Sequence, residues 1–176
     1  MRLPFKRLET ELVRSLKRSY REIIDAHSDE TLYAFGFYIM SDSCMVLVTG
    51  NTEELLQATH EKYNDGEDMR WHFGDWGILD EPEGGFGVVN EILDQMSDHM
   101  PSGWDWDDTT DPSVTLFETF ISSLRIVHES GLLGTGKERL RTVLMPVGDV
   151  EGNYMYRAIA RCNPASITRK MRFLKD

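Results

Sequence analysis

The stretch Leu32-Tyr-Ala-Phe-Gly-Phe-Tyr-Ile-Met40, followed shortly by Cys44-Met-Val-Leu-Val-Thr-Gly50, decides the fold of this chain. Aromatic and β-branched residues dominate both segments, which is the composition of β-strands. Only the turn-forming residues 41–43 separate them, whereas a crossover between parallel strands needs about a dozen residues or more. We therefore expect the two strands to pair antiparallel as a hairpin.

Helical patterns flank this hairpin on both sides. Upstream, apolar residues at spacings of three and four, among them Leu8 and Leu12, predict an amphipathic helix over roughly residues 4 to 26. Downstream, Asn51 is expected to be the N-cap of a second helix, and Glu54 stands where a capping box needs a carboxylate.

The remaining chain alternates helices with short strands. The expected elements are strands at residues 70–80 and 142–149 and helices at residues 86–101, 112–131, 152–161 and from 164 onward. Pro146 indicates an edge position or a bulge, because proline cannot donate to a sheet ladder. Together the elements predict an α/β (α+β) fold, with a mixed, largely antiparallel sheet and packed helices, in a single domain over residues 1–176.

Composition is that of a soluble globular protein from a reducing compartment. The chain is 40% apolar and 10% aromatic, which favours a packed core over disorder. No apolar run approaches the roughly 18 to 20 residues that span a bilayer, and the first residues lack the apolar core of a signal peptide. Cys44 and Cys162 are too few to indicate a disulfide framework. The expected location is the cytoplasm.

Negative charge is concentrated in one third of the chain. The formal net charge is −11, and the segment from Trp71 to Leu124 contains no Lys or Arg but 12 Asp and Glu residues. Such a surface is a poor match for nucleic acid or for an anionic membrane. Two interpretations remain, a basic protein partner and simple solubility.

Two segments resemble ligand-binding motifs but depart from them at decisive positions. Residues 131–137 follow a phosphate-binding pattern, but Glu138 replaces the Ser or Thr that binds magnesium, and the segment follows a helix rather than a strand. Residues 105–111 are rich in Asp, but Thr110 and Leu116 occupy the positions where a calcium loop needs Gly and Glu.

The remaining reactive side chains show no recognisable catalytic or metal-binding spacing. The five histidines do not form a zinc pattern, and neither cysteine has an activating partner in the sequence. We therefore expect no catalytic residues, no metal and no cofactor.

The acidic third contains a loop in which tryptophans alternate with carboxylates. Candidate partner-binding residues in this loop are Trp104, Asp105, Trp106, Asp107 and Asp108. Exposed aromatic anchors among carboxylates are suited to binding a basic partner. The alternative is that the loop folds its own tryptophans inward as a lid.

The order of elements and several short motifs resemble the bacterial domain of unknown function 4303 family over nearly the whole chain. The markers are Tyr33-Ala-Phe-Gly36, Asn51-Thr-Glu-Glu54, Arg70-Trp71 with Asp75-Trp76, and Gly131-Leu-Leu-Gly134. None of them is a catalytic signature, so the resemblance implies no active site, and the Trp104 loop is not among the markers. In size and acidity such families resemble immunity proteins that accompany bacterial polymorphic toxins.

These observations lead to two functional hypotheses. The first is a non-enzymatic protein-binding domain, an immunity-type inhibitor that binds a basic bacterial toxin through the face built from residues 71–111. The alternative is a small-ligand binder, or an enzyme of unknown reaction, with a pocket near Tyr33, Arg70, His72 and Asp75. Neither hypothesis involves nucleic acid or a membrane.

Overall fold

The predicted hairpin is the centre of the structure, a computed structural model in which β1 (Leu32–Met40) pairs antiparallel with β2 (Met45–Thr52). The structure describes residues 3–40, 45–63, 69–71, 73–79, 85–99, 112–134, 143–148 and 153–169, with only the backbone for 143–148 and 153–155. The other elements are α1 (Phe5–Ala26), α2 (Glu53–Tyr63), the 3-10 turns η1 (Met69–Trp71) and η2 (Phe73–Asp75), β3 (Ile78–Leu79), α3 (Gly87–Ser97), α4 (Pro112–Glu129), β4 (Val143–Gly148), α5 (Asn153–Cys162) and α6 (Ala165–Thr168).

The sheet is mixed and largely antiparallel, as the sequence predicted. Its strand order is β3-β2-β1-β4, with β4 parallel to β1 and the other two pairs antiparallel. Pro146 lies on β4, opposite Phe37 of β1. Since β4 is an edge strand, the missing N–H of this proline fits the predicted edge position.

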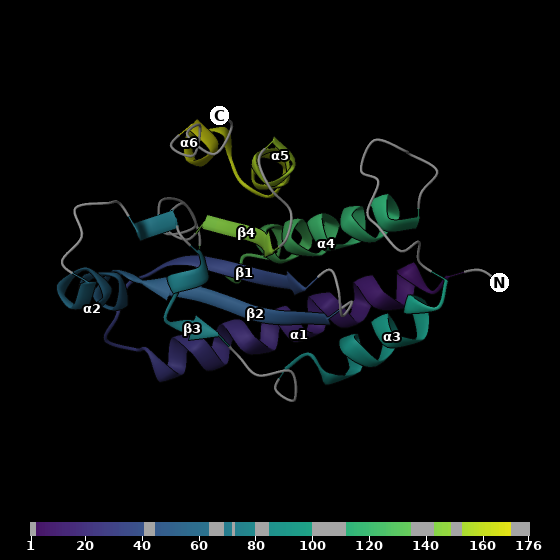
Figure 1. Cartoon of the computed structure of the whole chain (residues 1–176), viewed down its shortest axis with the longest axis horizontal. Coiled ribbons are helices and arrows are strands. Elements are labelled where there is room, and N and C mark those ends of the chain that lie inside the picture. The colour runs from purple at the N-terminus through teal and green to yellow at the C-terminus, as the bar shows by residue number, and fades with distance from the viewer. Residues whose placement is uncertain are drawn as a thin grey trace.

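Helices cover both faces of the sheet. Figure 1 shows α1 and α3 on one side of it and α5 and α6 on the other. The main core lies under α1, α3 and α4, where Phe37 of β1 packs against Phe86 and Phe120, each with its ring centroid 5.7 Å away. The alternate side chains of β1 point to the opposite face, where Ala34 joins a smaller cluster with residues of α2, α5 and α6.

A β-bulge near the start of β1 decides which face receives Tyr33. Leu32 pairs with Thr52 and Ala34 pairs with Asn51, so two steps along β1 oppose a single step along β2. Tyr33 is the additional residue. In a regular strand it would share the face of Phe35 and Phe37, but the bulge turns it to the opposite face beside Ala34.

Two sequence predictions need correction in this region. The N-cap of α2 is Thr52, whose Oγ1 accepts a hydrogen bond of 3.1 Å from the N–H of Leu55. Asn51 belongs to β2 instead, and the Glu54 carboxylate accepts a bond of 2.8 Å from the N–H of Thr31. The strand predicted at residues 70–80 is reduced to Ile78–Leu79, because the preceding described residues form the two 3-10 turns.

Candidate functional site

The residues predicted from the sequence divide into two groups. Trp104, Asp105, Trp106, Asp107 and Asp108 lie outside the described residues, as does His72. Tyr33, Arg70 and Asp75 are described, so the structure locates three of the four residues of the alternative pocket.

Tyr33 and Arg70 are in direct contact. The Tyr33 hydroxyl donates a hydrogen bond of 2.7 Å to the main-chain carbonyl oxygen of Arg70. The same carbonyl accepts a bond of 3.1 Å from the indole Nε1 of Trp76. The Arg70 guanidinium carbon lies 4.6 Å from the centre of the Tyr33 ring, a cation–π arrangement. The loop that carries Arg70 is thus held against the bulged residue of β1.

Glu53 and Asn51 complete this cluster from the end of β2 and the start of α2. Both nitrogens of the Arg70 guanidinium fork bind the two Glu53 carboxylate oxygens, at 2.8 and 2.6 Å. The Asn51 amide donates a hydrogen bond of 2.9 Å to the Tyr33 hydroxyl and accepts one of 3.2 Å from the N–H of Gly77. Asn51 is 1% exposed and Tyr33 is 4% exposed, so solvent does not reach the Asn51 amide or the Tyr33 hydroxyl. The cluster therefore fastens the 69–77 region to the sheet.

Asp75 lines a separate cavity between α2 and η2. Its volume is about 370 Å³, and neither Tyr33 nor Arg70 contributes to its walls. The lining residues are Leu55, Ala58, Thr59, Lys62, Tyr63, Gly74, Asp75, Trp76 and Gly77. The three described residues predicted for one pocket thus lie in two places, the Tyr33–Arg70 cluster and an open cavity beside it.

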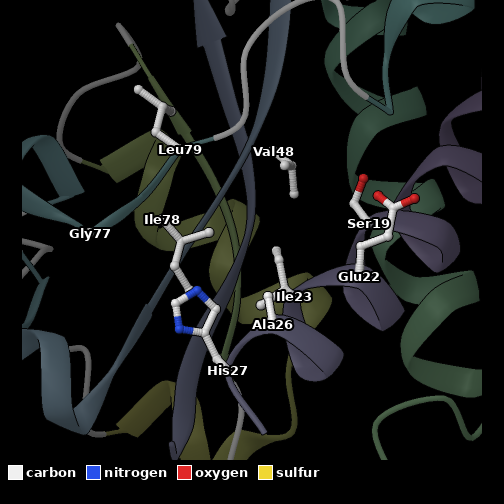
Figure 2. A pocket seen from close by; sticks show the side chains of 9 residues that line it. All are labelled: Ser19, Glu22, Ile23, Ala26, His27, Val48, Gly77, Ile78 and Leu79. Carbon is white, nitrogen blue, oxygen red and sulfur yellow. The ribbon is translucent and has the colours of Figure 1, made fainter.

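A second pocket lies between α1 and the β2–β3 edge. Its volume is about 350 Å³. Figure 2 shows α1 and the strands facing each other across it. Its walls are Ser19, Glu22, Ile23, Ala26, His27, Val48, Gly77, Ile78 and Leu79. Sequence reasoning missed it, because these residues come from three separate segments and carry no motif.

The chain matches the family model described as "Domain of unknown function (DUF4303)" over residues 12–164. This chain belongs to the DUF4303 family. No curated protein and no solved structure matches it.

Three of the four sequence markers that resembled DUF4303 meet in the cluster just described. Tyr33 comes from the first marker, Asn51 and Glu53 from the second, and Arg70 and Trp76 from the third. The fourth marker ends α4, where Gly131 and Gly134 adopt φ angles of 76° and 85° that favour glycine. These markers of the DUF4303 chain thus have structural roles that the geometry explains.

The outer face of α3 is one described part of the acidic segment in this DUF4303 chain. Glu91, Asp94 and Asp98 are exposed on it, and Val88 is 46% exposed at its start. No ion pair within the described part of the chain neutralises these three carboxylates.

Two titratable groups are perturbed by structural contacts. Hydrogen bonds from Thr52 and then His27 lower the pKa of the Glu30 carboxyl. Burial raises the pKa of the Cys162 thiol to about 12, which keeps it protonated and unreactive at neutral pH. Among the residues that the structure describes, no three His, Cys, Asp or Glu side chains gather where they could hold a metal ion. Within the same residues, no helix is both long and apolar enough to cross a membrane.

Proposed function

We propose that this chain is a non-enzymatic protein-binding domain that acts in the cytoplasm as an immunity-type inhibitor of a basic bacterial toxin. The observation that carries the proposal is the exposed carboxylate face of α3, which forms no ion pair with another described residue, within the segment 71–111 that the sequence singled out. An acidic face of this kind accelerates association with a basic protein and disfavours acidic competitors.

The position of the carboxylates on α3 favours binding over a structural role. Asp94 lies in the last turn of α3 and Asp98 is its C-cap residue, and the last turn contains no basic residue. Carboxylates at a helix C-terminus face the negative end of the helix dipole, which costs about 0.3 to 1 kcal/mol each. These carboxylates therefore destabilise the helix in the free protein. A bound cationic partner would offset this unfavourable interaction with the helix dipole. Carboxylates that served only solubility could lie elsewhere on the surface, without this cost.

The test replaces the three carboxylates and follows both binding and stability. In the triple variant Glu91→Gln/Asp94→Asn/Asp98→Asn, we expect equal or higher thermal stability but strongly reduced capture of a basic protein from the source cells at low salt. Raised ionic strength should slow capture by the unmodified chain, because it screens the charges that steer association.

A matched control removes the same charge elsewhere. The variant Asp25→Asn/Asp29→Asn/Glu61→Gln neutralises three exposed carboxylates of α1, the α1–β1 turn and α2, and should capture the partner normally. If both triple variants lose partner capture equally, the effect depends on net charge and not on the α3 face. Full retention by the α3 variant would exclude the acidic face as the binding surface.

The predicted tryptophan loop is a second arm of the same experiment. Trp104→Ala/Trp106→Ala and neutralisation of Asp105, Asp107 and Asp108 should each weaken capture if the loop extends the α3 surface. The tryptophan variant should raise the dissociation rate, since aromatic anchors contribute mainly after docking. The aspartate variant should lower the association rate and its salt dependence.

Small-ligand binding is a second candidate function, favoured by the cavity between α2 and η2. Its volume of about 370 Å³ is within the range of small-molecule sites, and Lys62, Asp75 and the aromatic side chain of Trp76 line it together. Gly74 also lines this cavity, and a Cβ placed there would meet nothing within 4 Å. Gly74→Leu should therefore fill the cavity without unfolding the chain.

This candidate is tested by a thermal-shift screen of small metabolites. A ligand of the cavity should raise the Tm of the unmodified chain but not that of Gly74→Leu. Gly87→Leu is the control, because a Cβ at Gly87 also meets nothing within 4 Å and Gly87 does not line the cavity. A ligand that stabilises both variants equally binds elsewhere.

A further inference from the structure

The pocket between α1 and the β2–β3 edge has two chemically distinct levels. Its floor is closed and mainly apolar, since Ile23, Val48 and Ile78 are 8%, 1% and 8% exposed, and the buried Ser19 lines the pocket with them. Its mouth is open, with the Glu22 side chain 61% exposed and Leu79 58% exposed. Figure 2 shows Glu22 on the α1 side and Leu79 on the strand side. A side chain that lies along this pocket would therefore contact hydrocarbon with its stem and a carboxylate at the rim.

This combination matches a long basic side chain. Lysine and arginine lay their methylene stems on apolar surface while the cationic end remains near water. No Lys or Arg is among the described residues that line the pocket. The cation recorded near Glu22 is Arg18, at 3.7 Å with both side chains more than half exposed, and such a surface pair is weak and can exchange.

The location of the pocket connects it to the acidic face of α3. β3 pairs with Thr49 and Gly50 of β2, and the Asn90 side chain of α3 binds both the N–H and the carbonyl oxygen of Val46 on the same edge. α3 and the pocket therefore lie along one edge of the sheet. A protein docked on the α3 carboxylates could extend a side chain along this edge to the pocket.

We propose that this pocket anchors a lysine or arginine side chain of the basic partner, with its methylenes on Ile23, Val48 and Ile78 and its charge at Glu22. The inference rests on the proposed function, because it names a contact by which that partner is held. The pocket contact adds a hydrophobic anchor to the charged contacts of the α3 face, and such anchors dominate the energetics of interfaces.

The pocket can be tested without knowing the partner. The probes are N-acetyl-lysine amide and N-acetyl-arginine amide, with N-acetyl-norleucine amide as the neutral analogue and N-acetyl-glutamate amide as the anionic one. In NMR titrations the cationic probes should shift the signals of Val48, Ile78 and Leu79 saturably, with dissociation constants on the order of millimolar. The norleucine probe should bind about three- to tenfold more weakly, and the glutamate probe should not bind.

Two substitutions separate the two levels of the pocket. Ala26 lines the pocket and is exposed, so Ala26→Leu should obstruct it and abolish the shifts caused by every probe. Glu22→Gln should keep norleucine binding and remove the advantage of the cationic probes. The matched controls Ala165→Leu on α6 and Glu61→Gln on α2 change exposed residues outside the pocket and should leave all affinities unchanged.

Each contrary result has a definite meaning. Absence of any shift up to roughly 50 mM probe, or equal binding of norleucine and lysine probes, would overturn the proposal. If the α3 variant loses the partner while Ala26→Leu retains it fully, the pocket inference fails and the acidic-face function stands. If Ala26→Leu loses the partner while the α3 variant retains it, the pocket stands and the proposed role of α3 fails.

Discussion

The Tyr33 hydroxyl and the Arg70 carbonyl oxygen, 37 residues apart along the chain, are joined by a hydrogen bond of 2.7 Å across the face of the sheet. The bond exists because the bulge in β1 turns Tyr33 away from the main core and toward the loop that follows α2. Together with the bonds from Asn51 and Glu53, it holds the described residues of the 69–77 region against the sheet. Gly77 of this region lines both cavities.

Tyr33→Phe should destabilise the fold without changing its shape. The substitution leaves the ring in place but removes the acceptor for the buried Asn51 amide and the donor to the half-buried Arg70 carbonyl, at a cost of about 1 to 3 kcal/mol. Urea unfolding monitored by tryptophan fluorescence measures the loss. Tyr63→Phe, at a side chain that is 54% exposed, is the control and should be nearly neutral.

Gly50→Ala should destabilise the central hairpin. A Cβ at Gly50 would lie 2.8 Å from the main-chain oxygen of Ala34, so the strands beside the bulge would have to move apart. The expected cost is about 1 to 3 kcal/mol, as for other overpacked cores. Gly74→Ala, where nothing lies within 4 Å, should change the free energy of unfolding by less than about 0.5 kcal/mol. Similar costs for both variants would contradict this account of the bulge.

Asn90→Ala should open the free edge of β2. The Asn90 amide accepts a bond of 2.9 Å from the Val46 N–H and donates one of 3.1 Å to the Val46 carbonyl oxygen, in place of a neighbouring strand. Without it, hydrogen exchange at the Val46 amide should accelerate more than exchange at amides in α4. Gln95→Ala, on the exposed face of the same helix, should leave the Val46 exchange rate unchanged.

The buried Cys162 thiol should make the fold sensitive to alkali. Its pKa is raised from about 9 to about 12, so above pH 9 the unfolded chain releases a proton that the folded chain retains. Stability from this group is therefore complete below pH 9 and is lost as pH rises toward 12. In a Cys44→Ser background, Cys162→Ala should flatten the fall in the free energy of unfolding over this range. The folded Cys162 thiol should also resist a thiol reagent until the chain unfolds.

Periodicity in the sequence was sufficient to predict the helices and the central hairpin, because both depend on neighbours along the chain. It could not reveal the bulge, since LYAFGFYIM has the composition of a regular strand and only pairing with Asn51 and Thr52 exposes the additional residue. The predicted N-cap of α2, Asn51, was wrong by one position, because here too the contacts that decide it come from residues far away in the sequence. Asn51 is recruited by Tyr33 and Gly77, contacts that a local motif does not contain.

The candidate site was predicted less completely than the fold. Tyr33 and Arg70 were predicted to line one pocket, and the structure brings them into direct contact in a cluster with Glu53 and Asn51. Residues 70–80 resembled a strand by composition, whereas part of them forms 3-10 turns. The Arg70 carbonyl accepts bonds from Tyr33, far away in the sequence, and from Trp76, instead of joining a strand ladder. The pocket lined by Glu22 and Leu79 had no signal in the sequence, since it depends on how α1 crosses the sheet edge.

The parallel pairing of β1 with β4 has a consequence for synthesis of the chain on the ribosome. Ala34 of β1 pairs with Val143 of β4, which is synthesised more than a hundred residues later. The β1 edge of the nascent hairpin therefore stays unpaired until most of the polypeptide has been translated. Loop closure over such a distance is slow, and an open edge invites pairing with other chains. Fragments that end before residue 143 should therefore aggregate, and a recombinant form of this domain must extend through β4 to remain in solution.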